Sequence, residues 1–287
     1  MEPRGLRTRR RRLLTRLAAL LGLALVALGL AVAVRPSVIG FGGKRYHGTD
    51  GTRLVRFDLR SRFVGGTLHE TAVVPPGRVR RPLLVLLHGR GSSADGILSD
   101  RFFSALRRLG RAAPVVLLPD GGDHSYWHDR RDGRWGTYVV REAIPAARRR
   151  FATTRGVAIG GISMGGFGAL DLARLYPLGF CAVGAHSAAL WRRAADTAAG
   201  AFDDAADFRR HDLLAVARRH RHLYGRRPVW IDGGDVDPFR STDRELARLL
   251  RGRVTYHVWP GGHESAYWDA HMPAYLRFYA RALRACR

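Results

Sequence analysis

One serine of this chain stands in a setting that favours nucleophilic chemistry. Ser163 lies at the centre of the segment GGISMGG, between an apolar run at 157–159 and a helical pattern at 167–176. A strand, a tight turn and a helix in that order lift a serine hydroxyl above the edge of a sheet. Gly161 and Gly165 have no Cβ, so the turn can be sharp enough to strain the serine backbone. Ser163 is the predicted nucleophile, and a glycine turn without a chemical role is the alternative.

A serine hydroxyl is a poor nucleophile near neutral pH and needs an adjacent base. Reactive residues of open α/β sheets gather just past the carboxyl ends of the strands. His263 follows an apolar run at 254–258 and lies in the glycine-rich segment Gly261-Gly262-His263. Among the 12 histidines, it alone combines this position with the chain order serine, acid, histidine. His263 is therefore the predicted base.

Three aspartates after the apolar run at 229–231 compete for the role of the acid that orients the base. Asp232 still belongs to the strand end, so a structural role is predicted for it. Asp235 lies in the turn and could cap it, and it is the alternative acid. Asp237 lies on a loop held by Pro238 and is the predicted acid of the triad.

Acyl transfer also requires donors for the oxyanion that develops on the attacked carbonyl. The backbone N–H that follows the nucleophile belongs to Met164. The second donor is expected in the loop after the first buried strand, where Arg90 is the first choice and Gly91 the second. The Arg90 side chain would then project outward, free to meet substrate.

The elements that must position these residues alternate along the chain. Leu54, Phe57 and Leu59, then Val64, Leu68 and Val73, alternate as in two antiparallel lead-in strands within residues 52–74. Continuous apolar runs typical of buried parallel strands follow at 83–87, 115–118, 157–162, 182–185, 229–231 and 254–258. Helical patterns lie near 96–109, 136–150, 164–176, 241–250 and 265–284. This order predicts an α/β fold with a mostly parallel central sheet and helices on both faces. Residues 187–227 are expected to form a small helical cap.

Three motifs together resemble one known family. The segments GISMGG, GDVDPF and GGH, in this order, resemble the esterase D family of α/β-hydrolases over residues 52–284. That family includes S-formylglutathione hydrolases, feruloyl esterase-like enzymes and the antigen 85 mycolyltransferases of mycobacteria. The resemblance implies an α/β-hydrolase fold, Ser163, Asp237 and His263 as the catalytic triad, and the N–H groups of Arg90 and Met164 as the oxyanion hole. It implies no cofactor.

The resemblance leaves three functions open. The first is a serine esterase that hydrolyses a carboxylic ester of a small molecule, a lipid or a carbohydrate through an acyl-enzyme. The second is an acyltransferase of antigen 85 type with the same triad. The third is a non-catalytic binding protein on a hydrolase scaffold, which the presence of all three triad residues disfavours.

Aromatic residues near the predicted site are candidates for the substrate pocket, and they are Tyr126, Trp127, Trp135 and Trp191. The same loop also carries groups that could suggest a metal site, namely Asp123, His124, His128 and Asp129. A substrate-lining or structural loop is the favoured interpretation, so no metal is expected.

The N-terminus predicts a membrane segment. Seven arginines between Arg4 and Arg16 precede an uncharged apolar stretch from Leu17 to Val34. At about 1.5 Å rise per residue this stretch spans roughly 27 Å, close to the hydrocarbon core of a bilayer. Residues 31–33 also match the small-residue pattern of a signal peptidase site. A retained anchor is slightly favoured over a cleaved signal peptide, with a cytoplasmic N-terminus in the first case.

The expected organisation follows from these signals. Residues 1–35 form a basic segment with a signal anchor or signal peptide, residues 36–51 a linker, and residues 52–287 the α/β-hydrolase catalytic domain. The membrane is an expected partner through the N-terminal helix. The catalytic domain is expected outside the cytoplasm, anchored or secreted.

The formal charge of +25 is large, and Lys44 is the only lysine among 49 basic residues. This composition is typical of a GC-rich coding genome. The basic residues are spread along the chain and form no nucleic-acid-binding motif, so no nucleic-acid partner is expected. The two cysteines are Cys181 and Cys286. A disulfide is possible in an exported protein, and two unpaired thiols are slightly favoured.

Overall fold

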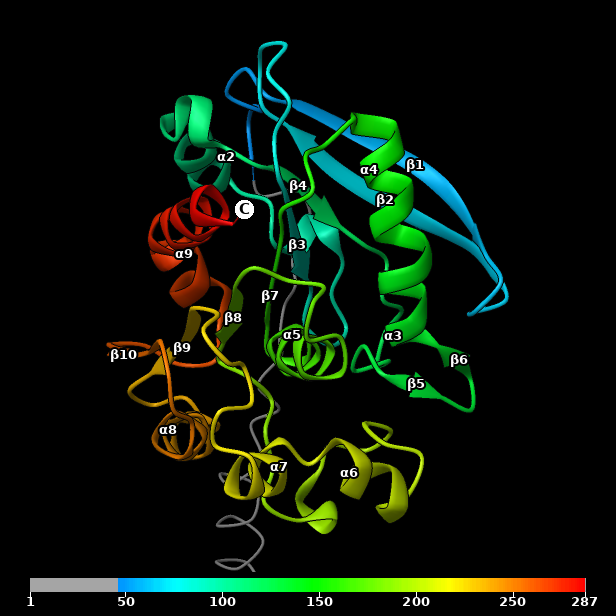
Figure 1. Ribbon diagram of the computed structural model, residues 1–287, viewed down its shortest axis with the longest axis vertical. Helices are drawn as coiled ribbons and strands as arrows, with labels where there is room; N and C mark the ends of the chain where they lie inside the picture. The colour runs from blue at the N-terminus through cyan, green and yellow to red at the C-terminus, as the bar shows by residue number, and fades with distance from the viewer. Residues whose placement is uncertain (1–45, 287) are drawn as a thin grey trace, which may run out of the picture. The chain divides into compact units, whose positions relative to one another are not determined.

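A central sheet organises the computed structural model, which describes residues 46–286 (Figure 1). Within this range the sheet has 8 strands in the order β1-β2-β4-β3-β7-β8-β9-β10. The strands are β1 (Arg53–Ser61), β2 (Gly66–Val74), β3 (Leu83–Leu87), β4 (Val115–Leu118), β7 (Val157–Ile162), β8 (Val183–His186), β9 (Val229–Gly234) and β10 (Val254–Trp259). β2 pairs antiparallel with β1 and β4, and the other pairs are parallel. The predicted mostly parallel sheet with antiparallel lead-in strands is confirmed.

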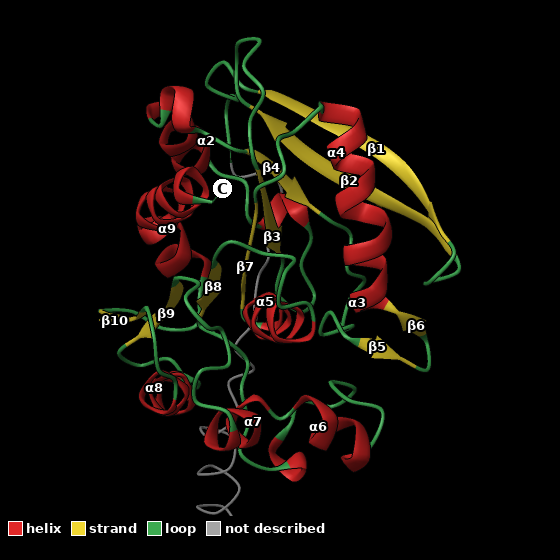
Figure 2. Cartoon of the chain, in the orientation of Figure 1, coloured by secondary structure: helices red, strands yellow, loops and turns green. Residues whose placement is uncertain are grey.

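Helices cover both faces of this sheet, as predicted (Figure 2). Helices α2 (Asp100–Arg108) and α9 (Ser265–Ala285) pack on one face, with a core that includes Phe102, Leu106 and Tyr279. Helices α4 (Ile144–Phe151), α5 (Met164–Leu175) and α8 (Arg240–Leu249) enclose a separate core on the other face. Because β3 lies between both layers, all five residues of its sequence LLVLL are buried.

Several local features differ from the simple alternation. The predicted helix at 136–150 consists of α3 (Trp135–Tyr138), a π-helical turn (Val139–Ala143) and α4, and a short hairpin precedes it with β5 (Asp129–Arg130) and β6 (Gly133–Arg134). Residues 187–227 contain a 3-10 turn at Ala194–Asp196 and two helices, α6 (Ala205–His211) and α7 (Leu213–Arg219). Two more 3-10 turns span Ala94–Gly96 and Gly110–Ala112.

The two cysteines form a disulfide, so the expectation of unpaired thiols was wrong. Cys181 precedes β8 and Cys286 follows α9, and their Cα atoms lie 5.7 Å apart, a normal distance for a disulfide. The two residues are separated by 105 positions in the sequence. Only the packing of α9 against the sheet brings them together.

The N-terminal predictions fall largely outside the described residues. The apolar stretch Leu17–Val34 lies there, and so do residues 1–45 as a whole. Between residues 46 and 286 no helix is long and apolar enough to cross a bilayer. At the end of the predicted linker, the buried Tyr46 ring packs edge-on against Phe103 of α2 at a centroid distance of 4.9 Å.

Candidate active site

Ser163 occupies a strained turn between β7 and α5. Its backbone has φ 56° and ψ −114°, a conformation that residues with a side chain rarely adopt. A Cβ added to Gly161 would lie 2.4 Å from the Gly165 carbonyl, and one added to Gly165 would lie 2.1 Å from the Leu87 oxygen. The two glycines are therefore sterically required, as the spacing predicts. The N–H of Ser163 donates to the carbonyl of His186 at 2.9 Å, which ties the turn to β8.

His263 lies next to this serine, after β10. Its Nε2 lies 2.8 Å from Ser163 Oγ, although 100 residues separate the two in the sequence. The rings of Phe239 and Trp268 pack against the imidazole at centroid distances of 5.2 and 5.0 Å. These two rings fix the orientation of the imidazole relative to Ser163. Only 14% of the His263 side chain is exposed.

Asp237 lies on the other side of the imidazole. Its Oδ2 lies 2.9 Å from His263 Nδ1, and its Oδ1 accepts from the N–H of Phe239 at 2.8 Å. Burial would raise the pKa of Asp237, but hydrogen bonds from His263, Phe239 and Ser187 outweigh this effect and lower its pKa below the ordinary value. The carboxylate therefore stays ionised, and the proton between the two side chains belongs on Nδ1. That tautomer leaves Nε2 free to accept from Ser163.

The two other aspartates of this loop have different surroundings. Asp235 Oδ1 accepts from the N–H of Gly261 at 3.0 Å and pins the loop that carries His263. Asp232 is fully buried, and its carboxylate accepts from His186 Nδ1 at 2.6 Å and Tyr275 Oη at 2.6 Å. Neither has a hydrogen bond to His263 among the described residues, so the geometry separates them from Asp237.

The first candidate oxyanion donor is at the start of α5. Met164 is the first residue of this helix, so no helical carbonyl can accept from its N–H. The helix start lies directly against the end of β3, since a Cβ on Gly165 would also lie 2.8 Å from the carbonyl of His88. This close approach brings the loop with Arg90 to the same place.

The two alternatives in that loop differ in their hydrogen bonds. The N–H of Gly91 donates to the Asp123 carbonyl at 2.9 Å, whereas in the described part of the chain the N–H of Arg90 has no such partner. His88 braces the loop, with Nδ1 2.9 Å from the Gly89 carbonyl and Nε2 accepting from the N–H of Gly121. Burial lowers the pKa of His88, so the ring is neutral and can accept. The geometry thus favours Arg90 over Gly91.

Two of the four predicted pocket residues reach the site through an aromatic row. The ring centroids of Tyr126 and Trp191 lie 5.6 Å apart, and those of Trp191 and Phe239 lie 5.5 Å apart. The Phe239 ring in turn packs against His263. Trp191 and Phe239 line a cavity of about 530 Å³ beside this row. The side chain of Arg90 is exposed, as predicted; burial raises the pKa of Tyr126, and the nearby Arg90 guanidinium partly offsets this effect.

The two other pocket candidates lie elsewhere. Trp127 is fully buried, and its indole N–H donates to the carbonyl of His88 at 3.1 Å. It is wedged against Gly168 of α5, where a Cβ would lie 2.4 Å from it, so the prediction that it lines a pocket was wrong. Trp135 covers Gly133 of the β5–β6 hairpin and Gly122 of the loop after β4. The Trp127 indole is structural, because the glycine opposite it makes room for packing, whereas the Trp135 indole is only partly buried.

One group in the described part of the chain has donor atoms close enough to hold a metal ion. His128, Asp207 and His211 are buried, and their nitrogen and oxygen atoms lie within 4.8 Å of one another. Of the loop residues weighed for a metal, only His128 belongs to it. Asp207 already accepts from His128 Nε2 at 3.1 Å and from Arg210 at 3.0 Å. The hydrogen bond between His128 and Asp207 connects the loop after β4 to α6.

Sequence reasoning missed several residues that support the triad. Ser187, with φ 53°, hydrogen-bonds Asp237, and it also accepts from the indole N–H of Trp268 at 3.0 Å. Burial, followed by repulsion from Asp237 and Asp232, raises the pKa of the neighbouring Asp243 well above its usual range. Ser187 directly follows β8, so a search past every strand end would have found it. No sequence signal marks Asp243.

The fold and this site define a serine hydrolase arrangement on an α/β-hydrolase-like scaffold. Residues 70–279 match the family model described as "Putative esterase". Because the match covers more than half of the chain, the protein belongs to this esterase family. The resemblance predicted from the three motifs is thereby confirmed.

A curated relative shares part of the sequence. Esterase Rv1288 of Mycobacterium tuberculosis (strain H37Rv) is 34% identical over an alignment of 116 positions, and the match covers 37% of this chain. The match spans only 25% of that protein's length.

Solved structures share the fold over most of the chain. A ferulic acid esterase has a TM-score of 0.70 at 20% identity, covering 80% of this chain and 98% of its own. An S-formylglutathione hydrolase from Agrobacterium tumefaciens has a TM-score of 0.69 at 21% identity, covering 81% and 96%. MPT51 (FbpC1) of Mycobacterium tuberculosis has a TM-score of 0.64 at 17% identity, covering 81% and 99%. At these identities the likeness shows the shared fold alone.

Proposed function

We propose that the protein is a serine esterase that hydrolyses a carboxylic ester through a Ser163–His263–Asp237 triad. The observation that carries the proposal is the continuous chain of short contacts from Ser163 Oγ through the imidazole to Asp237 Oδ2, at 2.8 and 2.9 Å. These distances lie within hydrogen-bond reach, as a nucleophile, base and orienting acid require. Family membership supports the ester as the substrate class.

The proposed reaction has two steps. His263 Nε2 accepts the proton as Ser163 Oγ attacks the ester carbonyl, and the N–H groups of Met164 and Arg90 donate to the oxyanion. The C–O bond to the alcohol breaks, the alcohol leaves with the proton from His263, and an acyl-enzyme remains. Water then attacks the acyl-enzyme with His263 again as the base, which releases the acid and restores Ser163. Asp237 stabilises the imidazolium in both steps.

A fluorophosphonate probe, which phosphonylates an activated serine, tests the nucleophile. We expect labelling of the wild type, none of Ser163→Ala, and full labelling of Ser241→Ala, the control at an exposed serine of α8. Equal labelling of the wild type and Ser163→Ala, or no labelling of either, would remove the catalytic role of Ser163. It would also revive the non-catalytic binding protein.

The identity of the ester and of the acyl acceptor belong to the same proposal. The aromatic row of Tyr126, Trp191 and Phe239 beside His263 supports an apolar acyl or alcohol group in the substrate. A p-nitrophenyl ester series of increasing acyl length would locate its preferred size. If added alcohols or sugars gave more transfer product than hydrolysis, the protein would be an acyltransferase with the same triad.

We further place the catalytic domain outside the cytoplasm, anchored or secreted. The predicted membrane segment at residues 17–34 supports this location, and so does the Cys181–Cys286 disulfide, since disulfides persist in oxidising compartments. Fractionation of cells followed by mass spectrometry of the mature N-terminus tests it. Recovery of full-length protein from the cytosol with reduced cysteines would refute it.

A further inference from the structure

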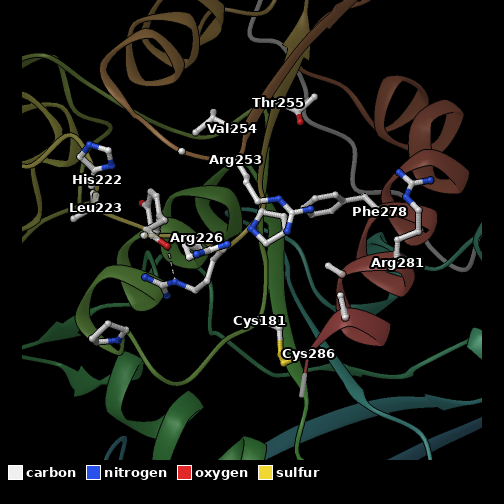
Figure 3. A pocket seen from close by; sticks show the side chains of 18 residues that line it. Cys181, His222, Leu223, Arg226, Arg253, Val254, Thr255, Phe278, Arg281 and Cys286 are labelled. Carbon is white, nitrogen blue, oxygen red and sulfur yellow. Dashed lines mark hydrogen bonds between the residues drawn. A yellow bond between two sulfur atoms is a disulfide. The ribbon is translucent and has the colours of Figure 1, made fainter.

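A large pocket lies at the N-terminal ends of the strands, and the side chains that line it are shown in Figure 3. Its volume is about 930 Å³, and it lies where β8, β9 and β10 begin, whereas Asp237 and His263 follow the ends of β9 and β10. Each of these two strands has 6 residues, so the pocket and the triad are separated by about 20 Å at about 3.3 Å per residue. The pocket is therefore distinct from the proposed ester site.

Three exposed arginines surround this pocket, and we call it the arginine pocket. They are Arg226 before β9, Arg253 before β10 and Arg281 on α9. In the described part of the chain none of the three has an ion pair or a side-chain hydrogen bond. The segments that line the pocket, residues 177–181, 222–228, 252–255 and 278–286, contain no aspartate or glutamate. No carboxylate of the lining thus balances the charge.

A fourth arginine of the pocket has a structural role. Arg227 donates to the carbonyls of Tyr224 at 2.9 Å and Ala173 at 2.8 Å. These bonds fix the segment that carries Arg226. The fourth guanidinium is therefore already occupied, and the three others are available to a ligand.

The floor and one wall of the pocket are rigid. Phe278 and Ala282 of α9 are buried and form an apolar floor beneath the arginines. The Cys181–Cys286 disulfide lies in the wall and joins the end of α9 to the sheet (Figure 3). A site held by a helix, strand starts and a covalent link needs little reordering when a ligand binds.

The arginine-rich composition explains how many arginines there are but not this arrangement. Several arginines elsewhere on the described surface pair with carboxylates, as Arg56 does with Asp95 at 2.7 Å and Arg192 with Glu245 at 2.7 Å, and others such as Arg60 are unpaired, but the pocket places three unpaired arginines around one cavity. Like charges that line one pocket without a counter-charge repel one another, and a bound anion relieves that repulsion. The planar guanidinium fork matches phosphate and carboxylate oxygens in a bidentate fashion.

We propose that the arginine pocket binds a multiply charged oxyanion of the phosphate class, with Arg226, Arg253 and Arg281 as its ligands. Three guanidinium groups match the several oxygens and charges of such a group better than those of a single carboxylate. The apolar floor at Phe278 accommodates a carbon portion attached to the phosphate. The source is either a soluble organic phosphate or the headgroup of an anionic lipid.

Pyrophosphate is the probe for the shared chemistry, measured by isothermal titration calorimetry at low ionic strength on the full chain. We expect binding by the wild type and a loss of about tenfold or more in affinity for Arg253→Ala and for Arg281→Ala, as one charged hydrogen-bond pair is removed. Arg60→Ala is the matched control. Arg60 is exposed on β1, the edge strand at the opposite side of the sheet from β10, and it has no ion pair among the described residues. Its affinity should stay at the wild-type value.

Two results would overturn the proposal. One is the absence of pyrophosphate binding by a wild-type protein with normal circular dichroism. The other is an equal loss in Arg60→Ala and the two pocket variants, which would mean diffuse attraction to the net charge. Thermal unfolding verifies that each variant is folded. The pocket arginines Arg226, Arg253 and Arg281 do not contact the triad.

Vesicles distinguish the two sources of phosphate. If Arg253→Ala and Arg281→Ala also lose binding to vesicles that contain phosphatidylglycerol, the ligand is a lipid headgroup. If these variants lose only pyrophosphate binding and their vesicle binding equals that of Arg60→Ala, the ligand is a soluble phosphate. Both results support the arginine pocket as the site.

Discussion

Replacing Asp237 by asparagine tests whether this carboxylate controls the tautomer of His263. Asp237 uses different oxygens to accept from His263 Nδ1 at 2.9 Å and from the Phe239 N–H at 2.8 Å. An asparagine has one acceptor oxygen and one donor amide group. If its oxygen stays on the Phe239 N–H, its NH₂ faces Nδ1. The imidazole proton must then move to Nε2, which can no longer accept from Ser163.

The opposite orientation of the amide is disfavoured. With its oxygen on His263, the NH₂ group would face the N–H of Phe239, and a buried donor without an acceptor costs about 1–3 kcal/mol. Most of the Asp237→Asn protein should therefore hold the wrong tautomer. We expect kcat to fall by about 10³–10⁴-fold, the size of effect that the loss of this carboxylate has in a serine triad. KM for a p-nitrophenyl ester should change little, because Asp237 does not contact the substrate.

Asp235→Asn is the matched control in the same loop. Asp235 accepts one hydrogen bond, from the Gly261 N–H at 3.0 Å, and an asparagine oxygen can keep it. We expect less than about a threefold change in kcat, within the range of a single weak surface contact. If Asp235→Asn lost as much activity as Asp237→Asn, or if Asp237→Asn kept more than about a tenth of its activity, the tautomer argument would fail.

Three further predictions concern stability and the nucleophile turn. Replacing both cysteines of the disulfide by serine should lower the free energy of unfolding by about 4.8 kcal/mol, because the bond closes a loop of 105 residues; urea unfolding measures this, and a loss below about 1 kcal/mol would contradict it. Burial raises the pKa of Glu70 to about 8 from an ordinary 4.5, so between these pH values the folded state holds a proton that the unfolded state has lost. The free energy of unfolding of the wild type should fall by up to about 1.4 kcal/mol per pH unit in this range. In urea unfolding, the free energy of unfolding of Glu70→Gln should depend less on pH, so the variant should become more stable relative to the wild type as the pH rises. Gly165→Ala should abolish esterase activity, because its Cβ would lie 2.1 Å from the Leu87 oxygen, and wild-type activity would refute the close approach.

The strands and helices could be predicted because their signals are local. The run LLVLL at Leu83–Leu87 is apolar throughout because the sheet is covered on both faces, and that requirement is visible in five consecutive residues. The turn at Ser163 was predictable for the same reason, since the glycines that a sharp turn requires lie two positions on either side. The candidate acids Asp235 and Asp237 could also be found from their place after a strand, because the carboxyl ends of parallel strands meet at one side of the sheet, but their position did not decide between them.

Other features depend on contacts between distant parts of the chain. Cys181 and Cys286 are 105 residues apart, and no local pattern shows that α9 returns to the start of β8. Trp127 is an aromatic residue of the kind that lines pockets, but its indole packs in the space above Gly168 of α5 and is buried in the core. Ser187 supports Asp237 from the end of a different strand. Each depends on which surfaces meet, and a sequence pattern does not contain that information.

The sequence by itself determined the kind of chemistry, because a serine between glycines, an acid and a histidine past successive strand ends already specify a nucleophile, an orienting acid and a base. The tertiary structure alone decided which acid reaches His263, which backbone N–H near Arg90 is free, and where the aromatic row lies. The tertiary structure also places Arg226, Arg253 and Arg281 around one pocket, which no sequence pattern indicates. The physical reason is that hydrogen bonds and charge interactions act over a few ångströms, and only folding brings residues far apart in the chain within that range.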